Sequence, residues 1–293
     1  MTAKKRLDLL LADNGYYASR EKARAAVMAR EVKVNGSVAT KPGQLIEEAD
    51  PVIEIKQKMP YVSRGGFKLA RALHAFNICL KNRTMLDVGA STGGFTDCAL
   101  QHGAAKVYAV DVGYGQIAWL LRNDPRVIVI ERTNIRHMEP SVFTAGMPDF
   151  VAIDVSFISL ALVLPKVNEL FDDYEGVALV KPQFEAGREL VGKKGVVRDA
   201  AAHRQALLKS TGAVLDCGAE VLGLDHSPIK GPRGNIEYLM HFRKPGGNGP
   251  IDATTIDMVV EKAHRIKEWP QTTGAGRWEN AIEGELSKTK PVS

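Results

Sequence analysis

Short apolar runs recur along the chain from about residue 83 onward, and polar or amphipathic segments separate them. The runs are TMLDVG (84–89), AKVYAV (105–110), RVIVI (126–130), DFVAID (149–154) and GVALVK (176–181). Runs of this length between helical segments are typical of buried strands in a doubly wound, parallel sheet. A later run, residues 236–243, predicts a further strand that could pair antiparallel. The pattern therefore predicts an α/β fold for this part of the chain.

Residues 1–58 show a different pattern, which predicts a small α+β unit. Four leucines before Gly15 predict a short helix that the glycine ends. Ser19 is a typical N-cap for a second helix, REKARAAVMAR. The segment VKVNGSV predicts a tight hairpin around Asn35 and Gly36, and VIEI predicts a closing strand.

Proline and glycine mark the boundaries of the two units. Residues 59–63, MPYVS, predict a short linker, because Pro60 interrupts any helix that would cross it. The α/β unit is then expected over residues 64–244, beginning with a helix near Ser63. The segment PGGNGP ends it. Residues 245–293 are expected to be a C-terminal tail with one candidate helix, TTIDMVVEKAHRIKEW, and a poorly ordered end.

Composition narrows the class of protein only modestly. The 293 residues carry a formal net charge of +5, which tolerates a polyanionic partner without requiring one. The three cysteines lie far apart and the seven histidines are scattered, so neither a disulfide framework nor a metal site is expected. No signal peptide or long uncharged apolar stretch is evident. We expect a cytoplasmic protein without a membrane or metal partner. The oligomeric state is left open, with a monomer as the starting expectation.

A glycine-rich turn follows the first apolar run. In DVGASTGGF, small residues let the backbone turn sharply, and the next helix directs free N–H groups to the same place. The spacing G-x-x-x-G-G differs from the dinucleotide pattern G-x-G-x-x-G. Asp111 ends the next run, where a carboxylate can accept hydrogen bonds from ribose hydroxyls. The turn and Asp111 predict a nucleotide-type site, and a helix cap is the alternative for Asp111.

Two charged residues end neighbouring apolar runs. Asp154 ends DFVAID and Lys181 ends GVALVK. A lysine at the end of an apolar strand is costly unless it has a partner, so both side chains are expected beside the ligand site. From the residues alone, a lysine that extends into solvent at the rim of the sheet is an equally good interpretation.

The N-terminal unit resembles the S-four RNA-binding domain. The resemblance rests on RLDLLLADNG, SREKARAAVMAREVKVNG and KPG, which cover nearly the whole unit. It implies that the second helix and the following turn lie on structured RNA. The phosphate contacts it implies are Arg20, Lys22, Arg24, Arg30 and Lys33. A solvated helix face is the alternative for these charges.

The larger unit resembles the FtsJ family of ribose 2′-O-methyltransferases, whose active sites use a Lys-Asp-Lys-Glu tetrad. The segments SRGGFKLA, AIDVSF, LVKPQFE and GNIEYL supply the matching Lys68, Asp154, Lys181 and Glu237. With the N-terminal unit, GVVRD and SPIKGPRGN, residues 5–243 resemble the TlyA family, which modifies ribosomal RNA at cytidine and is often labelled haemolysin. The resemblance implies a Rossmann-like class I methyltransferase fold with a seven-stranded, mostly parallel sheet.

The same resemblance implies S-adenosylmethionine as the cofactor and ribosomal RNA or ribosomal subunits as the partner. The implied cofactor contacts are Asp87, Gly89, Ala90, Ser91, Thr92, Gly93, Gly94, Phe95, Asp111, Asn134 and Asp154. Further RNA contacts are expected beside the catalytic segments, at Arg64, Arg188, Lys193, Lys194 and Arg233. Mobile surface loops are the alternative for the last four.

The chemistry implied is methyl transfer to a ribose 2′-hydroxyl. A neutral lysine can take or share the hydroxyl proton, and Lys181 is expected to do so, while Asp154 and Glu237 orient the two ammonium groups. Three other functions are an inactive RNA-binding protein, a membrane-active haemolysin and a pseudouridine synthase. The intact tetrad argues against an inactive RNA-binding protein, and the absence of an apolar span argues against a membrane-active haemolysin. The glycine-rich turn argues against a pseudouridine synthase.

Overall fold

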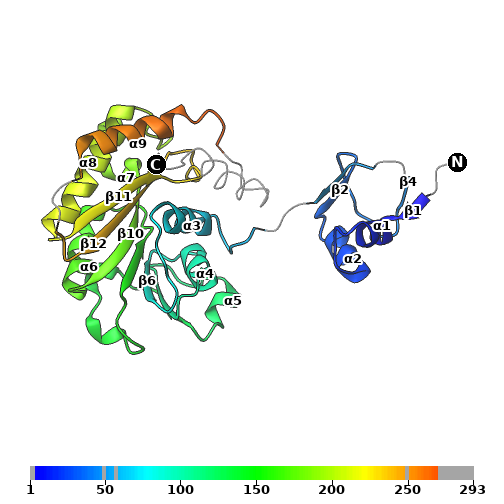
Figure 1. The fold of residues 1–293 in the computed structure, drawn as a ribbon, viewed down its shortest axis with the longest axis horizontal. Helices are drawn as coiled ribbons and strands as arrows, with labels where there is room; N and C mark the ends of the chain where they lie inside the picture. Colours follow the sequence, from blue (N-terminus) through cyan, green and yellow to red (C-terminus); the bar gives the residue numbers. More distant parts are fainter. Residues whose placement is uncertain (1–3, 48–50, 56–58, 248–250, 270–293) are drawn as a thin grey trace, which may run out of the picture. The chain divides into compact units, whose positions relative to one another are not determined.

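The computed structural model describes residues 4–47, 51–55, 59–247 and 251–269. The chain divides into two compact units, and the described parts of residues 1–59 and of residues 60–272 belong to the first and the second. Figure 1 draws the first unit in blue and the second from cyan to orange. The end of the C-terminal tail, for which the sequence predicts poor order, lies outside the described residues.

The first unit is the small α+β unit that the sequence predicts. Ser19 caps the second helix by accepting a hydrogen bond from the backbone of Lys22, and a hairpin turns at Asn35 and Gly36. The sequence did not predict a second, two-stranded sheet that pairs residues 4–6 at the start of the unit with residues 45–47. Its elements are β1 (Lys4–Arg6), α1 (Leu7–Asp13), α2 (Arg20–Met28), β2 (Val32–Val34), β3 (Ser37–Val38), β4 (Leu45–Glu47) and β5 (Ile53–Ile55).

The second unit is built on a seven-stranded sheet, as predicted. Its order is β11-β12-β10-β9-β6-β7-β8, and β12 runs antiparallel to both of its neighbours. The sequence did not predict β11, whose ladder with β12 is interrupted between Val221 and Gly223. The strands are β6 (Thr84–Val88), β7 (Lys106–Val110), β8 (Val127–Ile130), β9 (Phe150–Ile153), β10 (Tyr174–Val180), β11 (Glu220–His226) and β12 (Tyr238–Lys244).

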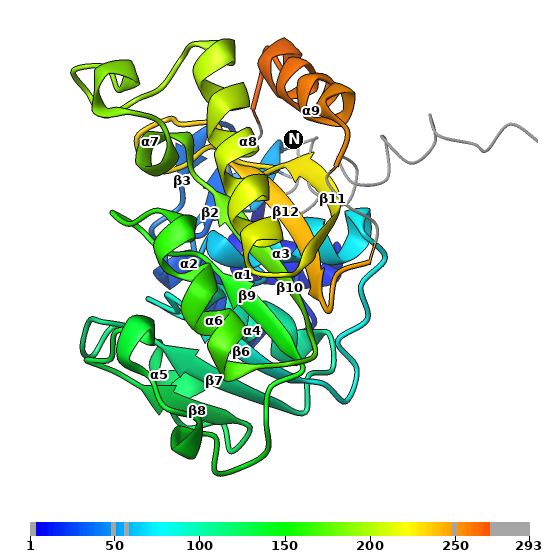
Figure 2. The same ribbon diagram turned by 90° about the vertical axis from the view of Figure 1, so that its left-hand side faces the viewer.

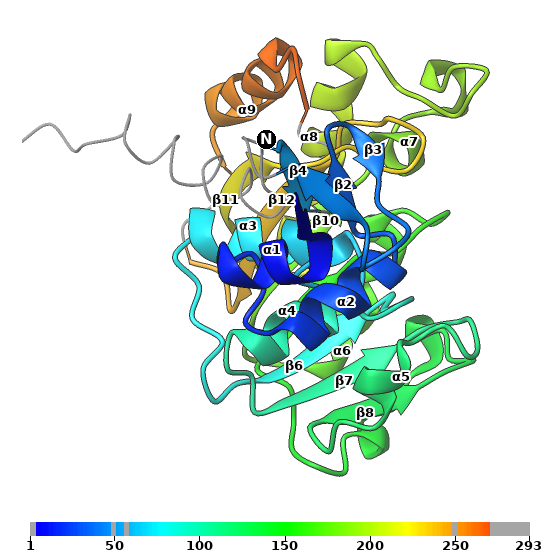
Figure 3. The same ribbon diagram turned by 90° about the vertical axis from the view of Figure 1, so that its right-hand side faces the viewer.

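Helices cover both faces of this sheet. The longer helices are α3 (Gly65–Ala75), α4 (Gly94–Gln101), α6 (Leu164–Leu170), α8 (Ala200–Asp216) and α9 (Ala253–Arg265). Short helices are α5 (Trp119–Arg122), α7 (Pro182–Glu185), η1 (Ile135–His137), η2 (Pro140–Val142), η3 (Leu160–Leu162) and η4 (Arg188–Leu190). Figure 2 shows α6 and α8 on one face, and Figure 3 shows α3 and α4 on the other.

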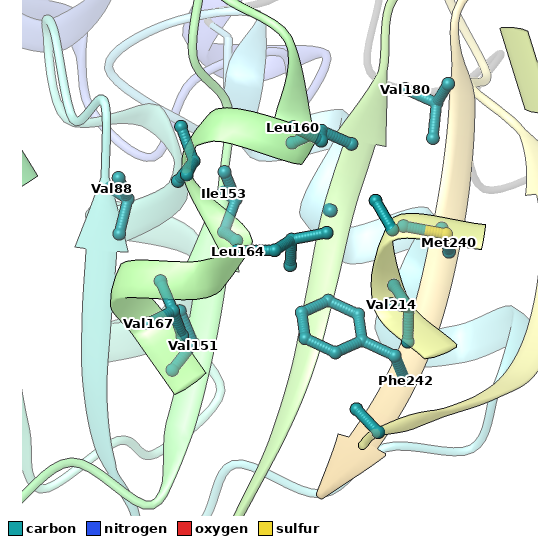
Figure 4. Close-up of a cluster of buried hydrophobic side chains, with 14 of the residues drawn as sticks. Val88, Val151, Ile153, Leu160, Leu164, Val167, Val180, Val214, Met240 and Phe242 are labelled. Atoms are coloured by element: carbon teal, nitrogen blue, oxygen red, sulfur yellow. The ribbon is translucent and has the colours of Figure 1, made fainter. Parts of the chain in front are cut away.

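Two apolar cores hold these layers together, one on each face of the sheet. The first joins β6, β9, β10 and β12 to α6, α8 and α9, and Figure 4 shows part of it, with Val167 and Val214 directed at the strands. The second joins the opposite faces of the strands to α3, α4 and α5. Each fully buried aliphatic side chain contributes about 1.5–3 kcal/mol, so these cores dominate the stability of the unit.

The helix that follows the sheet is part of the second unit. The apolar stripe of α9, formed by Ile256, Val259, Val260 and Ala263, is buried in the first of the two cores. Asp252 caps the helix by accepting a hydrogen bond from the backbone of Thr254. Residues 253–265 therefore pack as firmly as the helices between the strands, although they lie in the stretch that the sequence predicts to be a tail.

Candidate active site

The chain changes direction across the sheet between β6 and β9, and the candidate site lies at the carboxyl ends of these strands. From β6 the chain moves outward through β7 and β8, and it then returns to place β9 on the other side of β6. Ligands in open α/β sheets bind at such a switch point. Gly89 directly follows β6 with a φ of +88°, and a Cβ atom there would lie 2.6 Å from the carbonyl oxygen of Asp154. Glycine thus lets the two strand ends approach each other.

A first cavity of about 460 Å³ opens at this switch point. Of the residues that the sequence assigns to the cofactor, five line it: Gly89, Ser91, Asp111, Asn134 and Asp154. Further lining residues had no distinct signal in the sequence, because most are single apolar or amide side chains on loops: Val112, Gln116, Thr133, Ile135, Val155, Ser156, Phe157, Ile158 and Val163. The first cavity therefore has mostly apolar walls, and the carboxylates of Asp111 and Asp154 border it at two places.

The other residues of the glycine-rich turn are not among those that line this cavity. They are Ala90, Thr92, Gly93, Gly94 and Phe95, and all but Thr92 are buried. Gly94 is needed for packing, since a Cβ atom there would lie 2.2 Å from the Ser63 hydroxyl and 2.9 Å from the backbone nitrogen of Gly66. The turn thus holds the start of α3 against the start of α4.

Asp111 shapes the turn as well as facing the first cavity. Its Oδ2 accepts a hydrogen bond from the backbone of Ser91 at 2.8 Å, and its Oδ1 accepts one from the backbone of Gly113 at 2.7 Å. A carboxylate has about four acceptor positions, so two amide donors leave room for ligand hydroxyls. The alternative weighed from the sequence, a helix cap, is wrong, because Ala118 and not Asp111 is the N-cap of the next helix, α5. The geometry is compatible with the ligand-facing role.

Asp87 lies in β6 next to Val88, which lines the first cavity, and is fully buried. Its Oδ2 accepts a hydrogen bond from the Thr96 hydroxyl at 2.6 Å, which links β6 to α4. Burial raises the pKa of Asp87 to about 7, and the nearby carboxylate of Asp154 contributes to the rise. Asp87 is not among the residues that line either cavity described here, so its position indicates a supporting role.

The strand pairing explains why four charged residues meet beside the first cavity. Asp154 and Lys181 directly follow β9 and β10, which pair in parallel. Val180 pairs with Tyr238 in the antiparallel ladder, so Glu237, which directly precedes β12, lies at the same edge. Lys68 comes from the first half of α3. The four residues that the FtsJ resemblance implies are therefore assembled, although they span 170 positions of the chain.

These four side chains form a chain of buried ion pairs. Lys181 Nζ lies 2.6 Å from Asp154 Oδ1 and donates a hydrogen bond to Ser156 Oγ at 2.9 Å. Lys68 Nζ lies 2.7 Å from Glu237 Oε2 and 3.8 Å from Asp154 Oδ2. The carboxylate of Asp154 thus lies between the two ammonium groups, and the charges of the four groups balance.

The electrostatics of this cluster favour charged Lys68 and Asp154. Burial alone would lower the pKa of Lys68, but the carboxylates of Asp154 and Glu237 outweigh it, and the net pKa lies above its ordinary value. Burial likewise opposes ionisation of Asp154, but Lys68 and Lys181 hold the pKa of Asp154 below its ordinary value. Lys68 therefore remains an ammonium group at neutral pH and is unsuited to be a base.

A second cavity of about 420 Å³ adjoins the other side of the cluster. Lys181 and Glu237 line it, and it shares Ser156 and Phe157 with the first cavity. The other residues around it are Gln183, Phe184, Val191, Gly195, Gly231, Pro232, Arg233 and Asn235. Asn235 joins two of its walls, since its side chain bonds the backbone of Gly195 and of Val197. The charged cluster therefore lies between two cavities.

Comparison with known proteins identifies the family. Residues 61–244 match the model of FtsJ-like methyltransferases, and residues 5–52 match that of the S4 domain. TlyA of Mycobacterium tuberculosis, named a 16S/23S rRNA (cytidine-2′-O)-methyltransferase, is 43% identical over 272 residues, which are 92% of this chain and 100% of that protein. The chain belongs to the TlyA family of FtsJ-like methyltransferases.

Other TlyA-like proteins match over similar lengths. YqxC of Bacillus subtilis is 50% identical over 274 residues, which are 92% of this chain and 98% of YqxC. A solved structure from Streptococcus thermophilus, whose name describes it as a hemolysin, is 47% identical. It superposes with a TM-score of 0.70 and covers 90% of this chain and 97% of that one. In the described part of this TlyA-family chain, no helix combines the length and apolar composition needed to cross a membrane.

In the S4 domain, the five cations assigned to RNA are all exposed, but they differ in their partners. Arg20 donates a hydrogen bond to the buried carboxylate of Asp8 at 3.1 Å, so part of its role is structural. Lys33 lies 3.5 Å from Glu54. No acidic partner is found for Lys22, Arg24 or Arg30 among the described residues, which leaves these three as the clearest candidates for phosphate contact.

The cations assigned to RNA in the methyltransferase unit also differ. Lys193 and Lys194 are exposed on the loop that leads to Val197, and Arg233 is exposed at the second cavity. Arg64 is half-buried and donates a hydrogen bond to the backbone carbonyl of Lys230, so it supports the segment before Glu237. Arg188 lies in η4, and its side chain is outside the described part of the structure.

Proposed function

We propose that this chain transfers the methyl group of S-adenosylmethionine to the 2′-hydroxyl of a cytidine in ribosomal RNA, and that it does so in the cytoplasm. The observation that supports this proposal most is the buried Lys68–Asp154–Lys181–Glu237 cluster between two cavities. A group-transfer enzyme needs its two substrates in contact, and two adjoining cavities with a shared wall meet that need. The name of the M. tuberculosis relative describes the same reaction.

The first cavity fits the cofactor by its chemistry. The Asp111 carboxylate would accept hydrogen bonds from ribose hydroxyls, and the apolar walls at Val112 and Ile135 would hold an adenine ring. When bound, S-adenosylmethionine supplies a methyl group on a positively charged sulfur. The carboxylate of Asp154, which borders the cavity, would favour that positive charge.

The second cavity would hold the acceptor nucleotide, and Lys181 is the residue placed to act on its hydroxyl. Lys181 lines this cavity, whereas Lys68 is sealed between Glu237 and Asp154. We assign Lys68 and Glu237 to positioning: they fix Asp154, which in turn fixes Lys181. Lys181 would take or share the 2′-hydroxyl proton as the oxygen attacks the methyl carbon.

A test of this function uses ribosomal subunits from cells that lack the enzyme. Purified full-length protein and methyl-labelled S-adenosylmethionine should label the RNA, and mass mapping should place the label on a ribose. Lys181→Met should lower the single-turnover rate by about 10²-fold or more, with S-adenosylmethionine and RNA affinities nearly unchanged. Lys106→Met, at the amino end of β7 and hence the opposite edge of the sheet, is the matched control and should keep the parent rate.

Three results would contradict the proposed reaction or the role of Lys181 in it. Label on a base rather than a ribose would contradict the 2′-hydroxyl as acceptor. A Lys181→Arg variant as fast as the parent would exclude Lys181 as the group that takes the proton, because guanidinium stays protonated. Because the hydroxyl must lose its proton, the rate of the parent should also rise with pH, and a flat profile would assign Lys181 to positioning alone.

A further inference from the structure

The loop of residues 191–197 forms one wall of the second cavity, to which it contributes Val191 and Gly195. Most of its residues are exposed or half-buried, including the exposed Lys193 and Lys194, whereas Val197 is 2% exposed. A loop with few buried contacts opens easily unless particular bonds hold it. The position of this wall therefore depends on what holds Val197.

Both backbone groups of Val197 bond to buried side chains. Its N–H donates a hydrogen bond to Asn235 Oδ1 at 3.0 Å, and its carbonyl oxygen lies 3.0 Å from His203 Nε2. The Asn235 amide is fixed in this orientation, because its nitrogen donates to the carbonyl oxygen of Gly195 at 2.9 Å. His203 lies in α8 and is fully buried, and Asn235 is buried as well. The end of the loop is therefore held from two sides.

The second ring nitrogen of His203 connects the loop to the charged cluster. A carbonyl oxygen only accepts hydrogen bonds, so Nε2 carries the proton that bonds Val197, and Nδ1 is the acceptor of the neutral ring. Nδ1 lies 2.7 Å from the hydroxyl of Tyr238, which directly follows Glu237, and 3.2 Å from Nε2 of His264 in α9. Burial lowers the pKa of His203, which keeps the ring neutral near pH 7. The ring therefore joins the cavity wall to the strand beside Glu237.

We propose that His203 positions the 191–197 loop as a wall for the acceptor nucleotide, a role that rests on the function proposed above. His203 is buried and is not among the residues that line either cavity, so it acts through Val197 and not by contact with the RNA. With the loop closed, a ribose in the second cavity is confined beside Lys181. With the loop open this wall is missing, and fewer bound nucleotides reach the geometry for methyl transfer.

Glutamine and asparagine at position 203 separate the two bonds of the ring. The amide nitrogen of His203→Gln reaches about as far as Nε2 and can still donate to Val197, whereas the shorter His203→Asn ends near the position of Nδ1. A lost buried hydrogen bond shifts the equilibrium between the closed and the open loop roughly 5- to 150-fold. In single-turnover assays with ribosomal subunits from cells that lack the enzyme, His203→Asn should lower the maximal rate about fivefold or more. His203→Gln should keep most of the parent rate.

Limited digestion with trypsin measures the opening of the loop directly. Cleavage after Lys194, followed by mass spectrometry, should be faster in His203→Asn than in the parent or in His203→Gln. Asn235→Ala removes the other bond to Val197 and should also speed this cleavage, which keeps the proposal testable if His203→Asn does not fold. His74→Asn, at an exposed position of α3, is the matched control and should change neither the methylation rate nor the cleavage.

The contrary results separate this proposal from the proposed function. Parent-like rate and cleavage in His203→Asn, or a His203→Gln variant as slow as His203→Asn, would overturn the positioning role. A slower rate that is accompanied by a lower thermal midpoint or by weaker S-adenosylmethionine binding would assign His203 to the stability of the fold instead. If the parent labels no ribose, the proposed function fails and the role of His203 in the reaction fails with it, whereas tryptic cleavage still decides whether His203 holds the loop.

Discussion

Removing both members of the buried Lys68–Glu237 pair should cost less stability than the sum of the two single removals. Lys68 Nζ lies 2.7 Å from Glu237 Oε2, and the side chains are 9% and 1% exposed. In Lys68→Met, the carboxylate of Glu237 stays buried without its cation. Breaking a buried pair from one side typically costs 3–5 kcal/mol, whereas replacing both partners by neutral groups is often nearly neutral. We therefore expect Lys68→Met to lose about 3–5 kcal/mol of unfolding free energy.

The second partner and the double variant complete a thermodynamic cycle. Glu237→Gln should cost less, about 1–3 kcal/mol, because Lys68 keeps Asp154 at 3.8 Å. The double variant should lose about 2 kcal/mol less than the sum of the single losses, which is within the range for residues in contact. Lys106→Met, which removes a lysine from the far edge of the sheet, should change stability by less than about 0.5 kcal/mol.

Urea unfolding followed by tryptophan fluorescence measures these differences. Of the three tryptophans, Trp119 and Trp269 lie in the second unit. In a Trp278→Phe background, which removes the third, the signal therefore reports on the unit that holds the pair. With an m value of about 2–3 kcal/mol per molar urea, the midpoint of Lys68→Met should fall by about 1–2 M. A loss below about 1 kcal/mol, or a double variant that loses the full sum, would refute the coupling on which the positioning role of Lys68 depends.

Three further predictions concern the cofactor, the RNA and pH. Asp111→Ala should weaken S-adenosylmethionine binding at least tenfold in calorimetry, and unchanged affinity would place the ribose contact elsewhere. Alanine at both Lys22 and Arg24 should reduce the slope of log affinity for RNA against log salt by about 1.4–1.8, while a Lys22→Arg and Arg24→Lys exchange should preserve it. Burial raises the pKa of Asp87 to about 7, so the folded chain retains a proton that the unfolded chain releases near pH 4. The stability of the parent relative to Asp87→Asn should therefore fall as pH rises from about 4 to 7 and then level off in urea titrations.

The sequence predicted the fold well where patterns are strong and local. Apolar runs between helical segments predicted six of the strands in the large sheet, and Ser19 and the Asn35–Gly36 pair predicted a helix start and a hairpin. Strand β11 was not predicted, because its alternation is broken by Gly223 at the irregularity in its pairing and by polar residues at both ends. The packing of α9 was also missed, since an amphipathic stripe indicates a buried face but not the surface that covers it.

The candidate site was only partly accessible from the sequence. Residues at strand ends, such as Asp154 and Lys181, could be expected to meet because the ends of parallel strands share one edge. The resemblance added Lys68 and Glu237, which periodicity alone would not join. The walls of both cavities came only from the structure: Gln183 and Phe157 are ordinary residues in sequence, and only their burial and backbone conformation distinguish them.

The burial of α9 shows that the folded unit extends beyond the part of the sequence that matches the family model. The family model ends at residue 244, at the last residue of β12, but the core beneath α8 continues to Ala263. A polypeptide shortened to the family boundary would present the apolar groove that Ile256, Val259 and Val260 fill, and such a surface favours self-association. Recombinant versions of the catalytic part alone should therefore extend beyond α9, and the boundary chosen decides whether the product stays monodisperse.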